Sequence, residues 1–137
     1  KLRKLSRDDP RVIFTGVVNG ETKEELLSNA YLVTYPSLVG GLPLTILEAM
    51  GYRRCTLVSA ICGYYPVIKE CSSLFETGSI KDLSRKLILL MRNSIRCKEQ
   101  GQIAHDYVGA KFSWGDTALK FGNVLNEVKD NGYKRPF

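Results

Sequence analysis

The sequence predicts an α/β fold, with a parallel sheet of about four strands and a helical C-terminal portion. Two observations lead to this prediction. Short apolar runs alternate with helical patterns along the first half of the chain, which is the element order of a doubly wound sheet. Each apolar run is continuous instead of alternating with polar residues, which is typical of strands that are covered on both faces.

Four short runs are predicted to form the strands, because they are rich in β-branched or aromatic residues. They are residues 12–15, 31–35, 56–59 and 74–75. Gly16 follows the first run and Pro36 follows the second, so both are expected to end in turns.

Helical patterns connect these strands. Residues 21–30 place Leu26, Leu27 and Ala30 on one face of a predicted helix. A second helix is predicted over residues 43–52, because a proline suits the first helical position.

The C-terminal part is predicted to be helical. Residues 80–91 carry an apolar stripe, with Ser79 as the N-cap. A weaker pattern covers residues 95–108. A last helix follows Ser113, with a stripe formed by Trp114, Ala118, Phe121, Leu125 and Val128. The tail from Asn131 onward is expected to fray.

The composition is that of a folded globular chain. Of the 137 residues, 44% are apolar and 25% are charged, and the net charge is +6. No apolar run approaches the roughly 18 residues needed to span a membrane. The basic start resembles the polar end of a helix. We therefore expect residues 1–137 to be a single partial domain, with a strand-helix part over about 11–76 and a helical part over about 79–130.

The cysteines at positions 55, 62, 71 and 97 are expected to be reduced and non-catalytic. No pair has the spacing of a zinc knuckle, and His105 stands apart from them. The sequence therefore offers no metal ligands and no catalytic residue that can be named. Reduced thiols favour a cytoplasmic location.

Three segments follow predicted strands: residues 16–20, 37–45 and 60–66. Ligands bind at such places in open parallel sheets, because helix N-termini present free N–H groups and a positive dipole there. In the middle segment, Gly40 and Gly41 would allow the backbone to approach an anion closely before a helix begins. The same glycines would also fit an ordinary turn.

Residues 35–50 read YPSLVGGLPLTILEAM, which closely resembles the signature of family 4 retaining glycosyltransferases, enzymes of the GT-B fold. Further matching landmarks are Phe14-Thr15-Gly16, Asn29-Ala30-Tyr31, Leu57-Val58-Ser59, Leu74-Phe75-Glu76 and Phe112-Ser113-Trp114. The likeness runs from about residue 10 to residue 125. It is to the Rossmann-like C-terminal domain, which binds the nucleotide sugar, with the N-terminal side of that domain incomplete.

The resemblance implies the donor-binding part of a retaining hexosyltransferase, whose substrate is a nucleoside-diphosphate sugar. Glu48 would accept hydrogen bonds from the ribose hydroxyls. The main chain of residues 41–45 would face the sugar and the distal phosphate, and the loop after the first strand would border the base. The implied donor-binding residues are Glu48, Gly40, Gly41, Leu42, Pro43, Leu44, Thr45, Gly16 and Val17. Alternatively, Glu48 is a surface charge or a capping partner of Thr45.

The sequence also departs from the family's pattern. Gly40 stands where the family has a glutamate that touches the donor sugar, and Arg53-Arg54-Cys55 replaces a Gly-x-Pro turn. In the segment 60–66, only Gly63 matches. Because these departures fall in ligand-facing loops, the alternative is a degenerate domain that acts as a nucleotide-binding, structural or interaction module.

Other parts of the family's enzymes would precede residue 1. They are an Arg and a Lys that hold the diphosphate, two central strands and the N-terminal acceptor domain, which is an expected partner. We therefore expect the isolated chain to be inactive. The strand at 12–15 would either pair directly with the strand at 31–35 or leave an exposed edge.

No metal or other cofactor is expected, and neither is a nucleic-acid partner, because the sequence contains no recognised nucleic-acid-binding module. The positive charge is expected to meet the acidic donor or an anionic membrane surface. The second option would place the protein at the inner face of the membrane.

Overall fold

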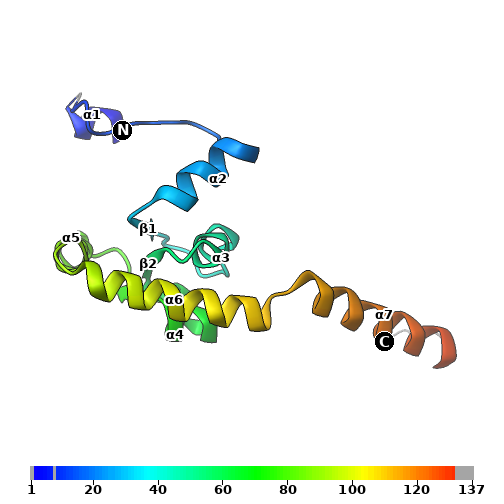
Figure 1. The fold of residues 1–137 in the computed structure, drawn as a ribbon. Coiled ribbons are helices and arrows are strands. Elements are labelled where there is room, and N and C mark those ends of the chain that lie inside the picture. The colour runs from blue at the N-terminus through cyan, green and yellow to red at the C-terminus, as the bar shows by residue number, and fades with distance from the viewer. Residues whose placement is uncertain (1, 8, 132–137) are drawn as a thin grey trace.

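The structure, a computed structural model, describes residues 2–7 and 9–131 and contains a three-stranded parallel sheet with helices around it (Figure 1). The strands are β1 (Leu32–Tyr35), β2 (Cys55–Ser59) and β3 (Ser73–Phe75), in this order across the sheet. Leu32 lies opposite Cys55, and Leu57 lies opposite Ser73. The predicted α/β class and parallel sheet are confirmed, with three strands instead of about four.

The helices are α1 (Leu2–Ser6), α2 (Gly20–Asn29), α3 (Leu44–Gly51), the 3₁₀ helix η1 (Ala60–Tyr64), α4 (Pro66–Cys71), α5 (Ile80–Met91), α6 (Ser94–Lys111) and α7 (Trp114–Asn131). All the helices predicted between residue 21 and residue 128 are confirmed. The sequence did not predict η1 and α4, and η1 lies in the segment 60–66 that was interpreted as a ligand-facing loop. Asn131 ends α7, and the rest of the tail predicted to fray lies outside the described residues.

Both predicted helix caps are confirmed. The Ser79 hydroxyl oxygen accepts a hydrogen bond from the Asp82 amide at 3.3 Å. The Ser113 hydroxyl oxygen accepts one from the Asp116 amide at 3.0 Å. Each serine thus satisfies one of the amide groups that a helix N-terminus leaves without an internal partner.

The strand predicted at residues 12–15 is wrong. These residues form an extended, exposed segment between α1 and α2, and Ile13 is 79% exposed. An apolar run becomes a strand only where a neighbouring strand completes its hydrogen bonds. In the described part of the chain, β1 pairs with β2 alone, so it forms an exposed edge of the sheet. Neither arrangement that the sequence left open for the strand at 12–15 is found, because that strand does not form.

The core lies on both faces of β2, whose residues are all buried. On one face, Val58 belongs to a cluster with Ile46 and Met50 of α3, together with residues of α4 and α6. On the other face, Cys55 and Leu57 pack with β3, α5 and the start of α6. The continuous apolar run in the sequence thus marks a strand covered on both sides.

Gly101 allows α6 to pass against the turn that ends α3. A Cβ atom at this position would lie 2.2 Å from the carbonyl oxygen of Arg53, closer than real contacts permit. Arg53 itself has a φ angle of 57°, in the left-handed region that favours glycine. Arg53 thus stands where the family's pattern has a glycine, and it adopts the backbone conformation that a glycine would have there.

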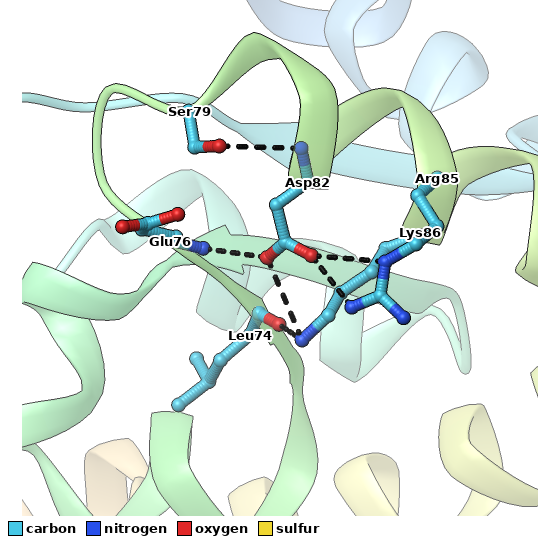
Figure 2. Close-up of polar contacts among 6 residues, drawn as sticks. All are labelled: Leu74, Glu76, Ser79, Asp82, Arg85 and Lys86. Atoms are coloured by element: carbon cyan, nitrogen blue, oxygen red, sulfur yellow. Dashed lines mark hydrogen bonds and ion pairs between the residues drawn. The ribbon is translucent and has the colours of Figure 1, made fainter.

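Asp82 organises the turn between β3 and α5 (Figure 2). Its carboxylate accepts hydrogen bonds from the Glu76 amide at 2.8 Å and from the Arg85 guanidinium at 2.7 Å. These two contacts, the arginine first, lower the pKa of the Asp82 carboxyl. Lys86 Nζ lies 3.8 Å from the same carboxylate and donates a hydrogen bond to the Leu74 carbonyl of β3.

Helix α7 extends beyond the end of α6 and away from the sheet (Figure 1). Its apolar stripe is exposed: Trp114 is 88% exposed and Phe121 is 65% exposed. In residues 2–7 and 9–131, no helix is both long enough and apolar enough to cross a membrane.

Candidate functional site

The candidate site is the loop of residues 36–43, which leaves the carboxyl end of β1 and leads into α3. Ser59, the last residue of β2, fixes the start of this loop. Its hydroxyl accepts a hydrogen bond from the Ser37 amide at 2.8 Å and donates one to the Tyr35 carbonyl at 3.2 Å. The Ser37 hydroxyl contacts the Val39 amide at 3.1 Å and the Val39 carbonyl at 2.8 Å. The loop is thus anchored to the neighbouring strand.

The two glycines of the loop differ in their surroundings. A Cβ atom at Gly40 would lie 3.4 Å from the Ile61 carbonyl oxygen, so this glycine packs against η1. Near Gly41 there is open space for a Cβ atom. The Gly41 backbone contacts the thiol of buried Cys62. Burial raises the pKa of this thiol, and the contact with Gly41 lowers it by a smaller amount. Both glycines are exposed, and a side chain or ligand atom has more open space at Gly41 than at Gly40.

Helix α3 begins without a side-chain cap in the described loop. Pro43 precedes the helix, and its carbonyl accepts hydrogen bonds from the amides of Ile46 and Leu47 at 2.9 and 3.3 Å. Leu44, at the first helical position, is 71% exposed. An uncapped N-terminus directs N–H groups and a positive dipole outward, which suits an anion.

Glu48 lies in the second turn of α3 and points toward α2. Its Oε1 atom is 2.7 Å from Nζ of Lys23, and both side chains are about two-fifths exposed. The hydrogen bond to Glu48 is the largest influence on Lys23 and raises the pKa of its ammonium group. Thr45 is not a capping partner of Glu48 in the described structure, where Glu48 pairs with α2 instead.

The structure does not bring all the predicted residues together. Residues 40–45 and Glu48 lie together in the loop and the first turns of α3, where Pro43 is buried. Gly16 and Val17 lie in the extended segment before α2, apart from the sheet (Figure 1). Val17 is 91% exposed, and neither residue is hydrogen-bonded to the loop within the described chain.

A cavity of about 120 Å³ opens on the other side of the loop, between the ends of the strands and the start of α5. It is lined mostly by apolar atoms, from residues that include Pro36, Leu38, Phe75 and Leu83. Pockets that enclose a whole small-molecule ligand measure roughly 300–1,000 Å³. This cavity therefore suits only part of such a ligand.

Sequence reasoning missed three residues that shape the site: Lys23, Ser59 and Cys62. Lys23 precedes buried Leu27 by four residues and thus shares its helix face, so the helical period could have placed it toward α3. For Ser59 and Cys62, the sequence contains no comparable signal, because their contacts with the loop arise from strand order.

The sequence profile of the family described as "Glycosyl transferases group 1" matches residues 7–106. This match covers more than half of the chain. The chain belongs to that family.

Two relatives outline its place among the group 1 glycosyltransferases. The chain is 32% identical over 115 residues to the serotype-specific mannosyltransferase WbdA of Escherichia coli, an alignment that covers 83% of this chain and 14% of WbdA. It is 35% identical over 60 residues to an uncharacterised glycosyltransferase of Methanocaldococcus jannaschii, covering 44% of this chain and 15% of that protein. The chain thus spans about a seventh of the length of these curated relatives.

Two solved structures share the fold of this group 1 glycosyltransferase chain. Sucrose-phosphate synthase from Thermosynechococcus elongatus superposes with a TM-score of 0.86 at 20% identity, over 96% of this chain and 34% of that protein. The C-terminal domain of the group 1 glycosyltransferase LpcC from Francisella tularensis gives a TM-score of 0.71 at 23% identity, over 82% and 61%. The arrangement of strands and helices is therefore that of glycosyltransferases of the GT-B type.

Proposed function

We propose that this chain is the donor-binding part of a retaining hexosyltransferase of family 4. One observation carries the proposal: the glycine loop at the carboxyl end of β1 opens into the uncapped helix α3, with Glu48 one turn farther on. Anionic ligands of open parallel sheets bind at such a loop and helix N-terminus.

In this proposal each part of the site has a separate role. The free amides at the start of α3 receive the distal phosphate, and the open surface at Gly41 leaves room for the sugar. The carboxylate of Glu48 accepts hydrogen bonds from two ribose hydroxyls. The chemistry needs no metal or other cofactor in this proposal, since backbone amides and the helix dipole stabilise the negative charge.

The isolated chain is proposed to bind the donor without transferring the sugar. It spans only 14% of the mannosyltransferase relative, and the cavity beside the loop holds only part of a ligand. A separate acceptor domain would supply the rest of the site. The mannosyltransferase relative makes mannose the first sugar to test. We also propose a cytoplasmic location, since the four cysteines are free.

Calorimetric titration with uridine, guanosine and adenosine diphosphates tests donor binding. We expect one of the three to bind, and Glu48→Ala to weaken it by roughly 10- to 100-fold, because hydrogen bonds to a charged group are lost. Glu127→Ala on α7 removes the same charge far from the site and should leave binding unchanged. Equal effects of the two substitutions, or no binding by the unmodified chain, would contradict the proposal.

Lys23→Met tests the ion pair. In the unliganded chain Lys23 occupies one oxygen of Glu48, so a ribose has to compete with it. We expect the substitution to tighten diphosphate binding by about two- to fivefold, which is the range expected for an exposed ion pair. The same titration would show weaker binding if Lys23 instead contacts the diphosphate.

The alternative is a degenerate domain, which two observations favour: Gly40 lacks a carboxylate, and Glu48 is already paired. Gly40→Glu distinguishes the two functions. The backbone at Gly40 is outside the left-handed region, and the nearest atom to a Cβ would be 3.4 Å away, so the substitution should fold. Tighter binding of a sugar nucleotide supports the donor site, and unchanged binding supports the degenerate domain.

A further inference from the structure

Two parts of the chain are strongly basic: residues 1–7, with four basic side chains, and residues 80–98. Residues 80–98 form α5 and the start of α6, and they carry six basic side chains and one acidic one. Their net charge is +5, compared with +6 for the whole chain. The basic residues are Lys81, Arg85, Lys86, Arg92, Arg96 and Lys98.

Residues 80–98 also expose large apolar side chains. They are Ile80, Ile88, Leu89, Met91 and Ile95, with exposed fractions between 45% and 83%. Leu83, Leu87 and Leu90 of α5 pack against the core, and none of the five exposed residues belongs to that core cluster. We call these five apolar and six basic residues the α5–α6 surface.

The α5–α6 surface borders a cleft of about 290 Å³ beside β3. The polar side chains lining this cleft are Ser72, Ser73, Arg85, Lys86 and Arg96. Asp82 holds Arg85 and Lys86 in place (Figure 2). Arg96 has no ion-pair partner within the described residues, so it is available to an anion. A neighbouring cleft contains Glu70 and Glu99, and Arg96 lines both clefts.

Exposed apolar side chains alone do not distinguish the α5–α6 surface, because α7 also exposes large apolar side chains. Residues 114–131 of α7, however, carry two basic and three acidic side chains, a net charge of −1. The combination of exposed apolar residues with positive charge is therefore found at the α5–α6 surface and not on α7. This combination is typical of surfaces that bind anionic lipid, because positive charge attracts the headgroups while apolar side chains enter the interface.

We infer that the α5–α6 surface docks the protein on an anionic phospholipid bilayer. The cleft beside β3 receives a headgroup phosphate on Arg96, and Met91 and Ile95 enter the boundary between headgroups and acyl chains. The inference is independent of the proposed sugar-nucleotide site, which lies at the loop before α3.

Co-sedimentation of the full chain with vesicles tests this docking. We expect binding to phosphatidylcholine vesicles with about one-third phosphatidylglycerol, and none to pure phosphatidylcholine. Each basic residue near the surface contributes about fivefold to binding, so Arg92→Gln with Arg96→Gln should weaken it by about 25-fold. Neither arginine belongs to the Asp82 cluster, so an unchanged melting temperature is expected. The matched control, Lys120→Gln with Lys129→Gln, removes two charges from α7 and should keep full binding.

A second pair of variants tests the apolar contribution. Met91→Ser with Ile95→Ser keeps the net charge and is expected to weaken vesicle binding by about tenfold, because two exposed apolar side chains no longer enter the interface. Leu119→Ser with Phe121→Ser on α7 is the control. Equal losses from the α5–α6 and α7 variants would overturn the inference. So would a chain that binds soluble tripolyphosphate but no vesicles, since the cleft would then serve a soluble anion.

Discussion

Arg53 adopts a backbone conformation that ordinarily belongs to glycine. Its side chain makes a single described contact, with Nη2 3.3 Å from Nε2 of His105. Nδ1 of His105 lies 2.7 Å from the Gly51 carbonyl, so it donates there and Nε2 accepts from the arginine. This exposed contact compensates for little of the backbone strain.

Arg53→Gly is therefore expected to stabilise the protein. The left-handed conformation costs a residue with a Cβ about 1–2 kcal/mol, while glycine loses about 0.4–1 kcal/mol through the greater entropy of the unfolded chain. The free energy of unfolding should rise by about 0.5–1 kcal/mol, measured by urea unfolding followed by circular dichroism. Arg53→Ala keeps the strain and should change stability little. A similar gain in both variants would show that the arginine side chain, not its backbone, is unfavourable.

At the scale of single residues, the sequence could predict where a residue lies in the fold better than which other residue it contacts. Glu48 lies on α3 beside the glycine loop, where the motif places it. Its ion pair with Lys23 was not predicted, because it joins two helices whose relative position depends on packing. Cys62 was expected to be a reduced cysteine, and its thiol is free and buried, but its contact with Gly41 depends on where η1 lies.

Among the elements, α6 depends on one glycine for its position. Gly101→Ala would place a methyl group 2.2 Å from the Arg53 carbonyl, so the helix or the turn has to move. We expect a loss of at least about 3 kcal/mol in the free energy of unfolding, at the upper end of the range for overpacking.

Gly109→Ala, in the same helix, is the matched control for this substitution. A Cβ atom at position 109 meets open space, so the substitution should stabilise the protein by up to about 1 kcal/mol through helix propensity. Urea unfolding of both variants gives the comparison. If Gly101→Ala were as stable as Gly109→Ala, α6 would not approach the turn this closely in solution.

The elements also show why some predictions were wrong. Residues 12–15 have the composition of a strand, yet a strand needs a hydrogen-bonded neighbour, and no composition supplies one. Residues 60–64 form a 3₁₀ helix although a loop was expected, because short 3₁₀ turns depend on local hydrogen bonds that leave little trace in the pattern of apolar residues. The longer helices were predictable, since their stripes repeat over several turns.

For the molecule as a whole, α7 is expected to contribute little stability. Its described side chains from Trp114 to Lys129 bury no apolar residue in the core. Deleting residues 113–137 should therefore change the free energy of unfolding by less than about 0.5 kcal/mol, as for surface changes. Ending the chain at Gln102 instead removes buried Ala104 and should unfold the protein. Thermal melts followed by circular dichroism test both chains. If deleting residues 113–137 caused a large loss of stability, α7 would have to fold back onto the domain.

Lys86 has a consequence for how the whole sheet can be extended. Its ammonium group donates a hydrogen bond to the carbonyl of Leu74, in the middle of β3. β3 is the outer strand on that side of the described sheet. A charged lysine on an edge strand discourages another strand from joining. The opposite outer strand, β1, pairs with β2 alone in the described chain. Additional strands are therefore expected to join the sheet at β1 in preference to β3.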